Sequence, residues 1–274
     1  MKRNSSISRA TCGMLVMMLL LVVHTTQGQS LRFNDTGYVN LGNNAALKLT
    51  NFTIEAWIKI EGYGSSTETG STGGGGMTGV VPIVTKGRAE TESAAVDVNY
   101  FIGYRLSDNR LIADFEDDAT SANHSVASTN ALPTCTWVHV AVSYNTSTDT
   151  WKMYINGALD RTLALGANFT PQAASNVHAC IGSSLNGGSI RAGFFNGRID
   201  EVRIWNVVRT DAQVSTNFNT ELSSGTGLVG RWDLNEGSGT TAANSGSAGA
   251  AANGTVMNGP VWVSGFNQAD PTTT

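Results

Sequence analysis

The sequence predicts an all-β fold in which two antiparallel sheets pack face to face as a β-sandwich. Three observations support this class. Charged residues make up only 14% of the 274 residues, and long amphipathic helices need more charge than this to solvate their outer faces. Glycine occurs 31 times, which is typical of a chain with many turns. Apolar and polar residues alternate along several segments, which is the period of a half-buried strand.

The first segment in chain order, residues 1–28, is predicted to be a secretory signal peptide. Basic residues precede the apolar run MLVMMLLLVV over 14–23, and small residues follow at Thr26-Gln27-Gly28. This is the layout of a cleavable leader. The run is about half the roughly 20 residues that a transmembrane helix needs. We therefore expect a secreted, extracellular chain without membrane insertion.

Strand alternation is clearest in three segments. Residues 52–60 (FTIEAWIKI) place phenylalanine, alanine and isoleucines on one face, and Thr53, Glu55, Trp57 and Lys59 on the other. Residues 137–144 and 151–155 repeat the pattern around the polar turn NTSTDT, which predicts a β-hairpin that stops at an Asn-Gly turn. Further strands are expected at 38–41, 81–85, 98–105, 110–116, 178–182, 198–205 and 228–234, with one short helical stretch within 209–222.

Two segments depart from this pattern. Residues 64–79 (GSSTETGSTGGGGMTG) are almost free of apolar side chains and are expected to form a flexible insertion between two strands. Residues 267–274 (NQADPTTT) are typical of a linker-like tail. Because strand patterning continues through the rest of 31–266, we expect one domain there.

Secretion would also make disulfide formation and N-glycosylation possible. Cys135 and Cys180 form an even pair, which favours a disulfide in an oxidising compartment, with two buried free thiols as the alternative. Six sequons provide candidates for N-glycosylation: Asn34, Asn51, Asn123, Asn145, Asn168 and Asn253.

Five segments in order carry a family resemblance. They read LRFNDTGYVNL (31–41), FTIEAWI (52–58), TWVHVAVSYNTSTDTWKMYING (136–157), FNGRIDEVRIW (195–205) and a closing segment that begins LVGRWDLNEGSG (228–239). Together they resemble the laminin-G-like, concanavalin A-like lectin and glucanase jelly rolls across 31–266. The resemblance implies a two-sheet jelly roll that binds its ligand at the loop-bearing rim or on the concave sheet, commonly with one calcium ion.

Asp200 is the leading candidate for a metal ligand. In GRIDEVRIW, period two places it on the buried face with Val202 and Ile204. A buried carboxylate needs hydrogen bonds or a cation, and Ca²⁺ prefers oxygen ligands. Asn34 and Asp35 could add oxygens if their strand lies beside that of Asp200, as the resemblance implies, although Asn-Asp-Thr-Gly replaces the family's usual Asp-Gly. The alternative is that Asp200 accepts hydrogen bonds from backbone N–H groups.

Catalytic motifs are missing from the sequence. The E-x-D-x-x-E strand motif of related jelly-roll glycosidases does not occur. Glu116, Asp117 and Asp118 are expected in a solvated turn, with a metal-binding or sugar-binding loop as the alternative. His139 is expected to be structural. Trp57, Trp151 and Trp232 could stack on sugar rings, with packing in the core as the alternative.

These observations predict a non-catalytic recognition module rather than an enzyme. Its expected partners are glycans or glycosylated extracellular and cell-surface ligands, with Ca²⁺ as a candidate cofactor. A protein-binding adhesion or structural module is the alternative, and a glycosidase is the least favoured. A net charge of −4 and a pI near 5.5 provide no basic footprint for nucleic acid.

Overall fold

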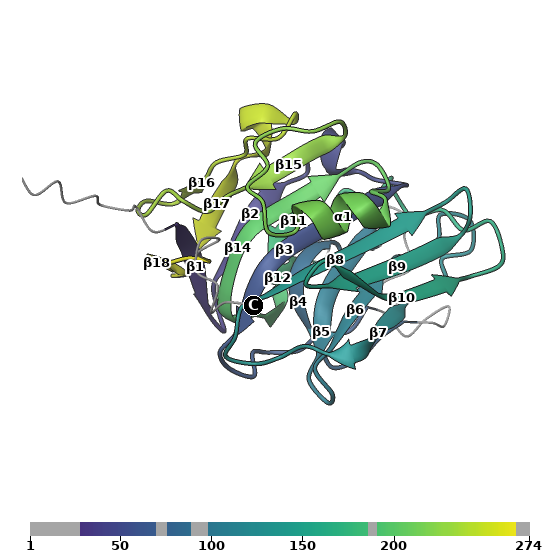
Figure 1. The fold of residues 1–274 in the computed structure, drawn as a ribbon, viewed down its shortest axis with the longest axis horizontal. Coiled ribbons are helices and arrows are strands. Elements are labelled where there is room, and N and C mark those ends of the chain that lie inside the picture. The colour runs from purple at the N-terminus through teal and green to yellow at the C-terminus, as the bar shows by residue number, and fades with distance from the viewer. Residues whose placement is uncertain (1–27, 70–75, 89–97, 186–190, 267–274) are drawn as a thin grey trace, which may run out of the picture.

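The computed structural model describes residues 28–69, 76–88, 98–185 and 191–266. The predicted signal peptide, except for Gly28, and the predicted tail lie outside these residues. The fold is the predicted sandwich of two large antiparallel sheets (Figure 1). Within the described residues, no helix is both long and apolar enough to cross a membrane.

Sheet A contains the most strongly alternating segments. Its strands, in spatial order, are β10 (Ala158–Ala164), β9 (Thr150–Ile155), β8 (Val138–Asn145), β3 (Phe52–Ile60), β14 (Asn196–Trp205), β1 (Gln29–Asn34) and β18 (Val261–Ser264), and β15 (Leu228–Trp232) also pairs with β14.

Sheet B packs against the inner face of sheet A. Its order is β16 (Thr241–Ala242), β17 (Gly254–Met257), β2 (Tyr38–Gly42), β11 (Ala179–Ile181), β4 (Val80–Lys86), β5 (Tyr100–Arg105), β6 (Arg110–Asp114) and β7 (Val126–Ala131). A small hairpin of β12 (Ser183–Leu185) and β13 (Arg191–Phe194) lies beside it. The strands expected from alternation are all confirmed, with ends that move by at most a few residues.

The core fills the space between the sheets with the predicted faces of the strands. The apolar face of β3 and the valines of β8 belong to one buried cluster. Aromatic rings add contact area there: Phe115 lies 4.4 Å from Tyr144, and Phe52 lies 5.7 Å from Trp151 (centroid distances). Burial of such large side chains is the main source of stability in a sandwich.

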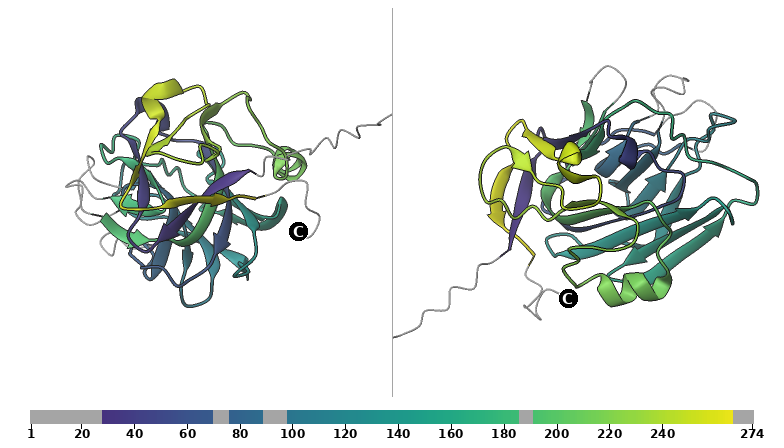
Figure 2. Two further views of the ribbon diagram at one scale, coloured as in Figure 1. Left: turned by 90° about the vertical axis from the view of Figure 1, so that its left-hand side faces the viewer. Right: turned by 90° about the horizontal axis from the view of Figure 1, so that it is seen from above.

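The outer face of sheet A is also largely covered, which the alternation did not predict. Thr53, Glu55 and Trp57 on the polar face of β3 are buried. The cover is the segment from Asn206 to Leu222, which contains the short helix α1 (Asp211–Asn217), together with the chain that follows β18. Figure 2 shows α1 outside the sandwich, against sheet A. The helix is shorter than the expected stretch and begins with a capping box between Thr210 and Gln213.

The predicted insertion at 64–79 is tied to the fold at both described ends. Thr67 and Val80 exchange backbone hydrogen bonds, and Thr69 N–H donates to the carbonyl oxygen of Met77. Residues 70–75 of this segment lie outside the described residues. The insertion does lie between two strands, β3 and β4, and its flexibility stays a prediction.

Candidate functional site

A β-bulge at Glu201 changes the face on which Asp200 lies. Opposite β3, Asp200 pairs with Trp57 and Arg203 pairs with Glu55, so two residues of β14 stand opposite one residue of β3. Glu201 adopts a positive φ of 47° at this point. A bulge of this kind shifts the alternation by one residue. The prediction that Asp200 shares the core face with Val202 and Ile204 is therefore wrong, and Asp200 lies on the outer face.

Asp200 is nevertheless buried, because the chain after β18 crosses over it. Its Oδ1 accepts a hydrogen bond from Glu201 N–H and its Oδ2 accepts one from Phe266 N–H, each at 2.8 Å. Burial raises the pKa of Asp200 well above its usual range, against the hydrogen bond from Phe266. Both oxygens thus serve backbone N–H groups, as the alternative prediction for Asp200 proposed.

Asn34 and Asp35 do not join Asp200 in a metal site. Their strand does lie beside β14, as the resemblance implied, but Asn34 pairs with Asn196. Asn196 and Asp200 are four positions apart along β14, a distance of roughly 13 Å. Asp35 Oδ2 accepts a hydrogen bond from Asn196 Nδ2 at 2.9 Å, at the end of the strand. The three residues therefore do not fit a single Ca²⁺ ion, and no group of three or more His, Cys, Asp or Glu side chains among the described residues could hold a metal.

Glu55 is the centre of a buried charge cluster on the same outer face. Its Oε1 accepts hydrogen bonds from Trp205 Nε1 at 2.8 Å and from Arg209 Nη1 at 2.9 Å, and Arg203 Nη1 lies 3.7 Å away. His139 Nε2 lies 3.4 Å from Oε2. Burial raises the pKa of Glu55, but His139 and the two arginines outweigh it and lower the pKa to about 2. Burial lowers the pKa of His139, so near neutral pH the cluster contains an ionised Glu55 and a neutral imidazole.

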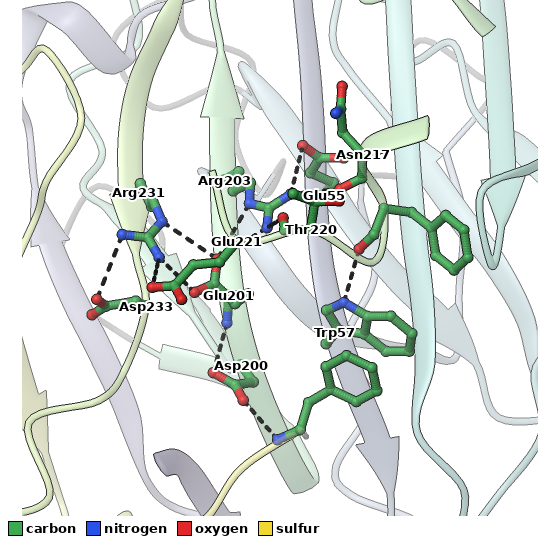
Figure 3. Close-up of polar contacts among 12 residues, drawn as sticks. Glu55, Trp57, Asp200, Glu201, Arg203, Asn217, Thr220, Glu221, Arg231 and Asp233 are labelled. Carbon is green, nitrogen blue, oxygen red and sulfur yellow. Dashed lines mark hydrogen bonds and ion pairs between the residues drawn. The ribbon is translucent and has the colours of Figure 1, made fainter. Parts of the chain in front are cut away.

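A second carboxylate, Glu201, extends this cluster toward β15 (Figure 3). Arg203 Nη2 lies 3.1 Å from Glu201 Oε2, and Arg231 Nη2 lies 2.7 Å from Glu201 Oε1. Arg231 also contacts Glu221 at 2.9 Å and Asp233 at 3.5 Å. The buried arginines and carboxylates compensate one another, which a buried charge requires.

The cluster fastens the cover to sheet A. Arg203 donates to the carbonyl oxygens of Asn217 and Thr220, and Trp57 Nε1 donates to that of Phe218 at 3.0 Å (Figure 3). The Trp57 ring stacks on Phe266 with centroids 3.6 Å apart. These groups are shielded from solvent, so their contribution is to hold the fold together. The expected structural role of His139 agrees with its place in this cluster.

The tryptophans proposed for sugar stacking are in the interior. Trp57 is 1% exposed, and Trp151 and Trp232 are fully buried. Their indole N–H groups donate to the carbonyl oxygens of Phe218, His124 and Ala252, respectively. The alternative prediction for these residues, packing in the interior, is therefore the one that the structure confirms.

The predicted disulfide is wrong. Cys135 and Cys180 are both free thiols. Cys180 packs in an apolar cluster with Tyr38, Val177 and Leu185 on sheet B, and burial raises its thiol pKa. Cys135 is exposed in the chain before β8, and its N–H donates to the carbonyl oxygen of Ile60, the last residue of β3. The two side chains therefore occupy unrelated surroundings.

The sequons differ in accessibility. Asn123 is buried, and its Nδ2 donates to the carbonyl oxygen of Thr69 and to Asp114 Oδ2, so the folded chain has no room for a sugar there. The asparagines at 34, 168 and 253 are exposed, and those at 51 and 145 are half-buried. Glycosylation at these five positions stays a prediction.

The acidic residues expected in a solvated turn are partly interior. Glu116 and Asp117 are each 1% exposed, whereas Asp118 is exposed. Asp117 accepts hydrogen bonds from the N–H groups of Thr120 and Thr170 at 2.9 and 2.8 Å. The carboxylate of Asp117 thus organises the loop by accepting backbone hydrogen bonds.

A surface pocket at the rim of the sandwich has the features of a binding site. It encloses about 350 Å³ between the end of β3, the β5–β6 turn and the chain before β8. Tyr63 stands at this pocket with 86% of its surface exposed. Tyr104 forms another part of the lining, and its hydroxyl donates to the carbonyl oxygen of Tyr63 at 3.1 Å. Polar groups are supplied by Glu61, Asn109 and Thr134.

Two other pockets lack an aromatic side chain. One lies beside α1 and is lined by Ser143, Lys152 and Asp211 among others. The other is lined by residues 66–68 with Thr78, Gly79, Arg88 and Ala192. The Tyr63 pocket is therefore the best candidate for recognising a ligand with both apolar and polar faces.

The sequence prediction missed Tyr63, although a signal was present. It is a single aromatic residue between two glycines, at the start of a polar segment with few other apolar residues. Such an aromatic has no alternating neighbours with which to form a strand face. Exposure is then the natural expectation, and exposed aromatics suit recognition.

Comparison with known proteins supports the fold. The family model described as the concanavalin A-like lectin/glucanases superfamily matches residues 33–215. A proposed carbohydrate-binding protein from Bacteroides ovatus has a TM-score of 0.61 at 20% identity, with 87% of this chain covered; this chain spans 60% of that protein. The CBM40 of the Ruminococcus gnavus IT-sialidase, bound to α2,3 sialyllactose, has a TM-score of 0.50 at 14% identity and coverages of 69% and 96%. No curated protein sequence matches the chain.

Proposed function

Because the chain belongs to the concanavalin A-like lectin/glucanase superfamily, we propose that it is a secreted, non-catalytic module that recognises carbohydrate. The family and the fold permit this function but do not assign it, since one fold serves many functions. Support comes from the structural neighbours, which include a proposed carbohydrate-binding protein and a sialyllactose complex. Support for secretion comes from the leader-like residues 1–28.

The observation that carries the proposal is the exposed ring of Tyr63 at the rim pocket. A pyranose ring presents C–H groups on its faces and hydroxyls at its edges. The C–H groups pack on an aromatic face, and the hydroxyls need hydrogen-bonding partners nearby. Tyr63 offers the ring, while Glu61, Asn109 and Thr134 line the same pocket with carboxylate, amide and hydroxyl groups. A pocket of this volume, lined by aromatic rings and a few polar groups, has the usual composition of a small-molecule site.

The non-catalytic part of the proposal is supported by the state of the buried carboxylates. A glycosidase needs two carboxyl groups that face the substrate across a short gap. Glu55 and Glu201 are instead enclosed and paired with arginines. Asp200 is occupied by backbone N–H groups.

Binding of the purified protein to a glycan array tests the function. We expect a defined set of glycans to bind, and Tyr63→Ala to weaken the affinity for them about tenfold through loss of ring stacking. Leu159→Ala is a matched control, because Leu159 is also an exposed large apolar residue, 45% exposed on β10 and outside the pocket.

Three results would contradict the proposal in different ways. A blank array with retained binding to extracellular proteins would favour the adhesion function. An equal loss of binding in the Tyr63 and Leu159 variants would move the site away from the pocket. Release of reducing sugars from a polysaccharide panel would show that the protein is an enzyme.

A further inference from the structure

Three basic side chains form one row across the outer face of sheet A. Arg32 of β1 pairs with Arg198 of β14, and Arg198 pairs with Lys59 of β3. Their side chains are 53%, 24% and 26% exposed, respectively. This row follows that of Trp57 and Asp200, which is buried. Thus the cover of the outer face ends before the row, and the basic groups reach solvent.

The strands approach closely at this row, which fixes the spacing of the charges. Gly197 precedes Arg198, and a Cβ atom at Gly197 would lie 2.0 Å from the carbonyl oxygen of Lys59. Only glycine allows β14 to lie this near to β3 at that position. The three basic side chains are therefore held beside one another by the backbone rather than by a flexible loop.

One carboxylate serves all three cations. Glu61 lies 2.9 Å from Arg32 Nε, 2.9 Å from Arg198 Nε and 3.9 Å from Lys59 Nζ. Like charges that face each other across strands repel, and a single carboxylate leaves the row with an excess of positive charge. The whole chain is acidic, with a net charge of −4. The local excess is therefore a property of this corner and not of the protein surface in general.

The row is continuous with the rim pocket, because Glu61 also lines the pocket beside Tyr63. Arg32 and Lys59 do not line the pocket itself, so only a ligand that fills the pocket and extends past Glu61 would reach them. Among the described residues, Arg32 pairs only with Glu61 and is half exposed. Its guanidinium can bind a second anion, since it carries five N–H donors in a planar fork.

We propose that the ligand of the Tyr63 pocket is an acidic saccharide, whose carboxylate or sulfate group is bound by Arg32 and Lys59. This inference rests on the proposed function and specifies its ligand class. Carboxylate and sulfate share the negative charge and the oxygen acceptors that the row recognises, so the structure assigns the class that includes both.

The test uses an array that presents each backbone in matched acidic and neutral forms. For chondroitin, the forms are the sulfated hexasaccharide, the desulfated hexasaccharide and the desulfated, carboxyl-reduced hexasaccharide; hyaluronan and galacturonan oligosaccharides are paired with their carboxyl-reduced forms. We expect the protein to bind mainly the acidic forms. This binding should weaken as NaCl is raised from 0.15 to 0.5 M, because the added salt shortens the electrostatic screening length to about half. Retained binding after desulfation would identify carboxylate as the group recognised, and its loss would identify sulfate.

Variants separate this inference from the proposed function. Arg32→Gln and Lys59→Gln should each weaken binding of the acidic forms about tenfold and leave that of neutral forms unchanged. Arg191→Gln removes the same charge from an exposed position on β13 and should have no effect. Equal binding of acidic and neutral forms would overturn the acidic ligand while the saccharide function stands. If no glycan binds in any form, both proposals fail.

Discussion

Two groups of charged residues on the same outer face of sheet A differ in what covers them. Glu55, Glu201, Arg203 and Arg231 are buried beneath the segment from Asn206 to Leu222. Arg32 and Lys59 lie on the same face and remain open to solvent. The same two strands, β3 and β14, contribute residues to both groups, with the bulge at Glu201 between them. The two groups differ in that the cover lies over only one of them.

The comparison shows how burial decides the role of a charge. In the covered group, desolvation makes each ion dependent on its partners, and loss of one partner leaves a costly unpaired charge. In the open group, water and salt screen the ions, and their pairing contributes little to stability. The covered charges thus contribute to the stability of the fold, whereas the open charges remain in contact with solvent.

The largest expected effect comes from breaking the covered cluster at its centre. Glu55→Gln would leave Arg203 and Arg209 without their shared carboxylate, and should lower the free energy of unfolding by about 3–5 kcal/mol. Urea unfolding followed by tryptophan fluorescence measures this change. The matched control is Glu221→Gln, because Glu221 also pairs with an arginine but is 60% exposed; we expect a change below about 1 kcal/mol. Equal effects of the two variants would contradict the distinction between covered and open charge.

Acid should weaken the same cluster without mutation. The pKa of Glu55 is about 2 in the folded chain, against 4.5 for an unperturbed carboxyl. The ionised form is favoured by folding, so this stability is complete above pH 4.5 and is lost as the pH falls toward 2, by about 3 kcal/mol. Asp114 and Asp200 act in the opposite sense, because burial raises their pKa values and folding favours their protonated forms.

Protonation of Asp114 and Asp200 should therefore stabilise the folded chain as the pH falls through their raised pKa values. Burial lowers the pKa values of His139 and His124, so these residues oppose that gain as the pH falls below 6.5. The loss from Glu55 should follow below pH 4.5. Unfolding free energies measured at intervals from pH 7 to pH 2.5 test this profile. Glu55→Gln should lose most of the acid-side decline, whereas Glu221→Gln should keep it. A decline of the same size in both variants would assign the acid sensitivity to other carboxyl groups.

A smaller effect is expected where the cover ends, at Asp200. Asp200→Ala removes the acceptor of two backbone N–H groups, and should lower stability by about 2 kcal/mol. It should also shift the fluorescence of Trp57, because the hydrogen bond to Phe266 N–H helps to hold the Phe266 ring against the indole. Ca²⁺ and EGTA should leave the melting temperature of the unaltered protein unchanged. A rise with Ca²⁺ that Asp200→Ala abolishes would restore the predicted metal ligand and contradict the role as backbone acceptor.

The architecture was predictable because alternation is a local property. The inward faces of β3 and β8 can be recognised in FTIEAWIKI and WVHVAVSY, and both contribute to the core. The outward faces were misjudged, since the residues that cover them lie 70 or more positions later in the chain. Glu55 and Trp57 have the pattern of solvated residues, yet Arg209 and Phe218 bury them.

The candidate sites were harder to predict because they depend on register and on a bulge. Asp200 changes faces through one extra residue at Glu201, which period two does not reveal. The basic row requires three strands to align, and Arg32 and Lys59 are 27 residues apart in sequence. The family resemblance implied that β1 lies beside β14, but not which residues face one another.

The smallest effect on the free energy of unfolding is expected for a change in the exposed basic row. Arg32→Gln removes one exposed partner of Glu61 and leaves Arg198 at 2.9 Å from the same carboxylate. We expect the free energy of unfolding to change by less than about 0.5 kcal/mol. It could rise slightly, because the repulsion between Arg32 and the facing Arg198 is also removed. Urea unfolding at 0.02 and 0.5 M NaCl measures both possibilities, since a net repulsion would make the variant more stable than the unaltered protein only at low salt. A loss above about 2 kcal/mol would instead place Arg32 among the residues that hold the fold, and the open row would no longer differ in kind from the covered cluster.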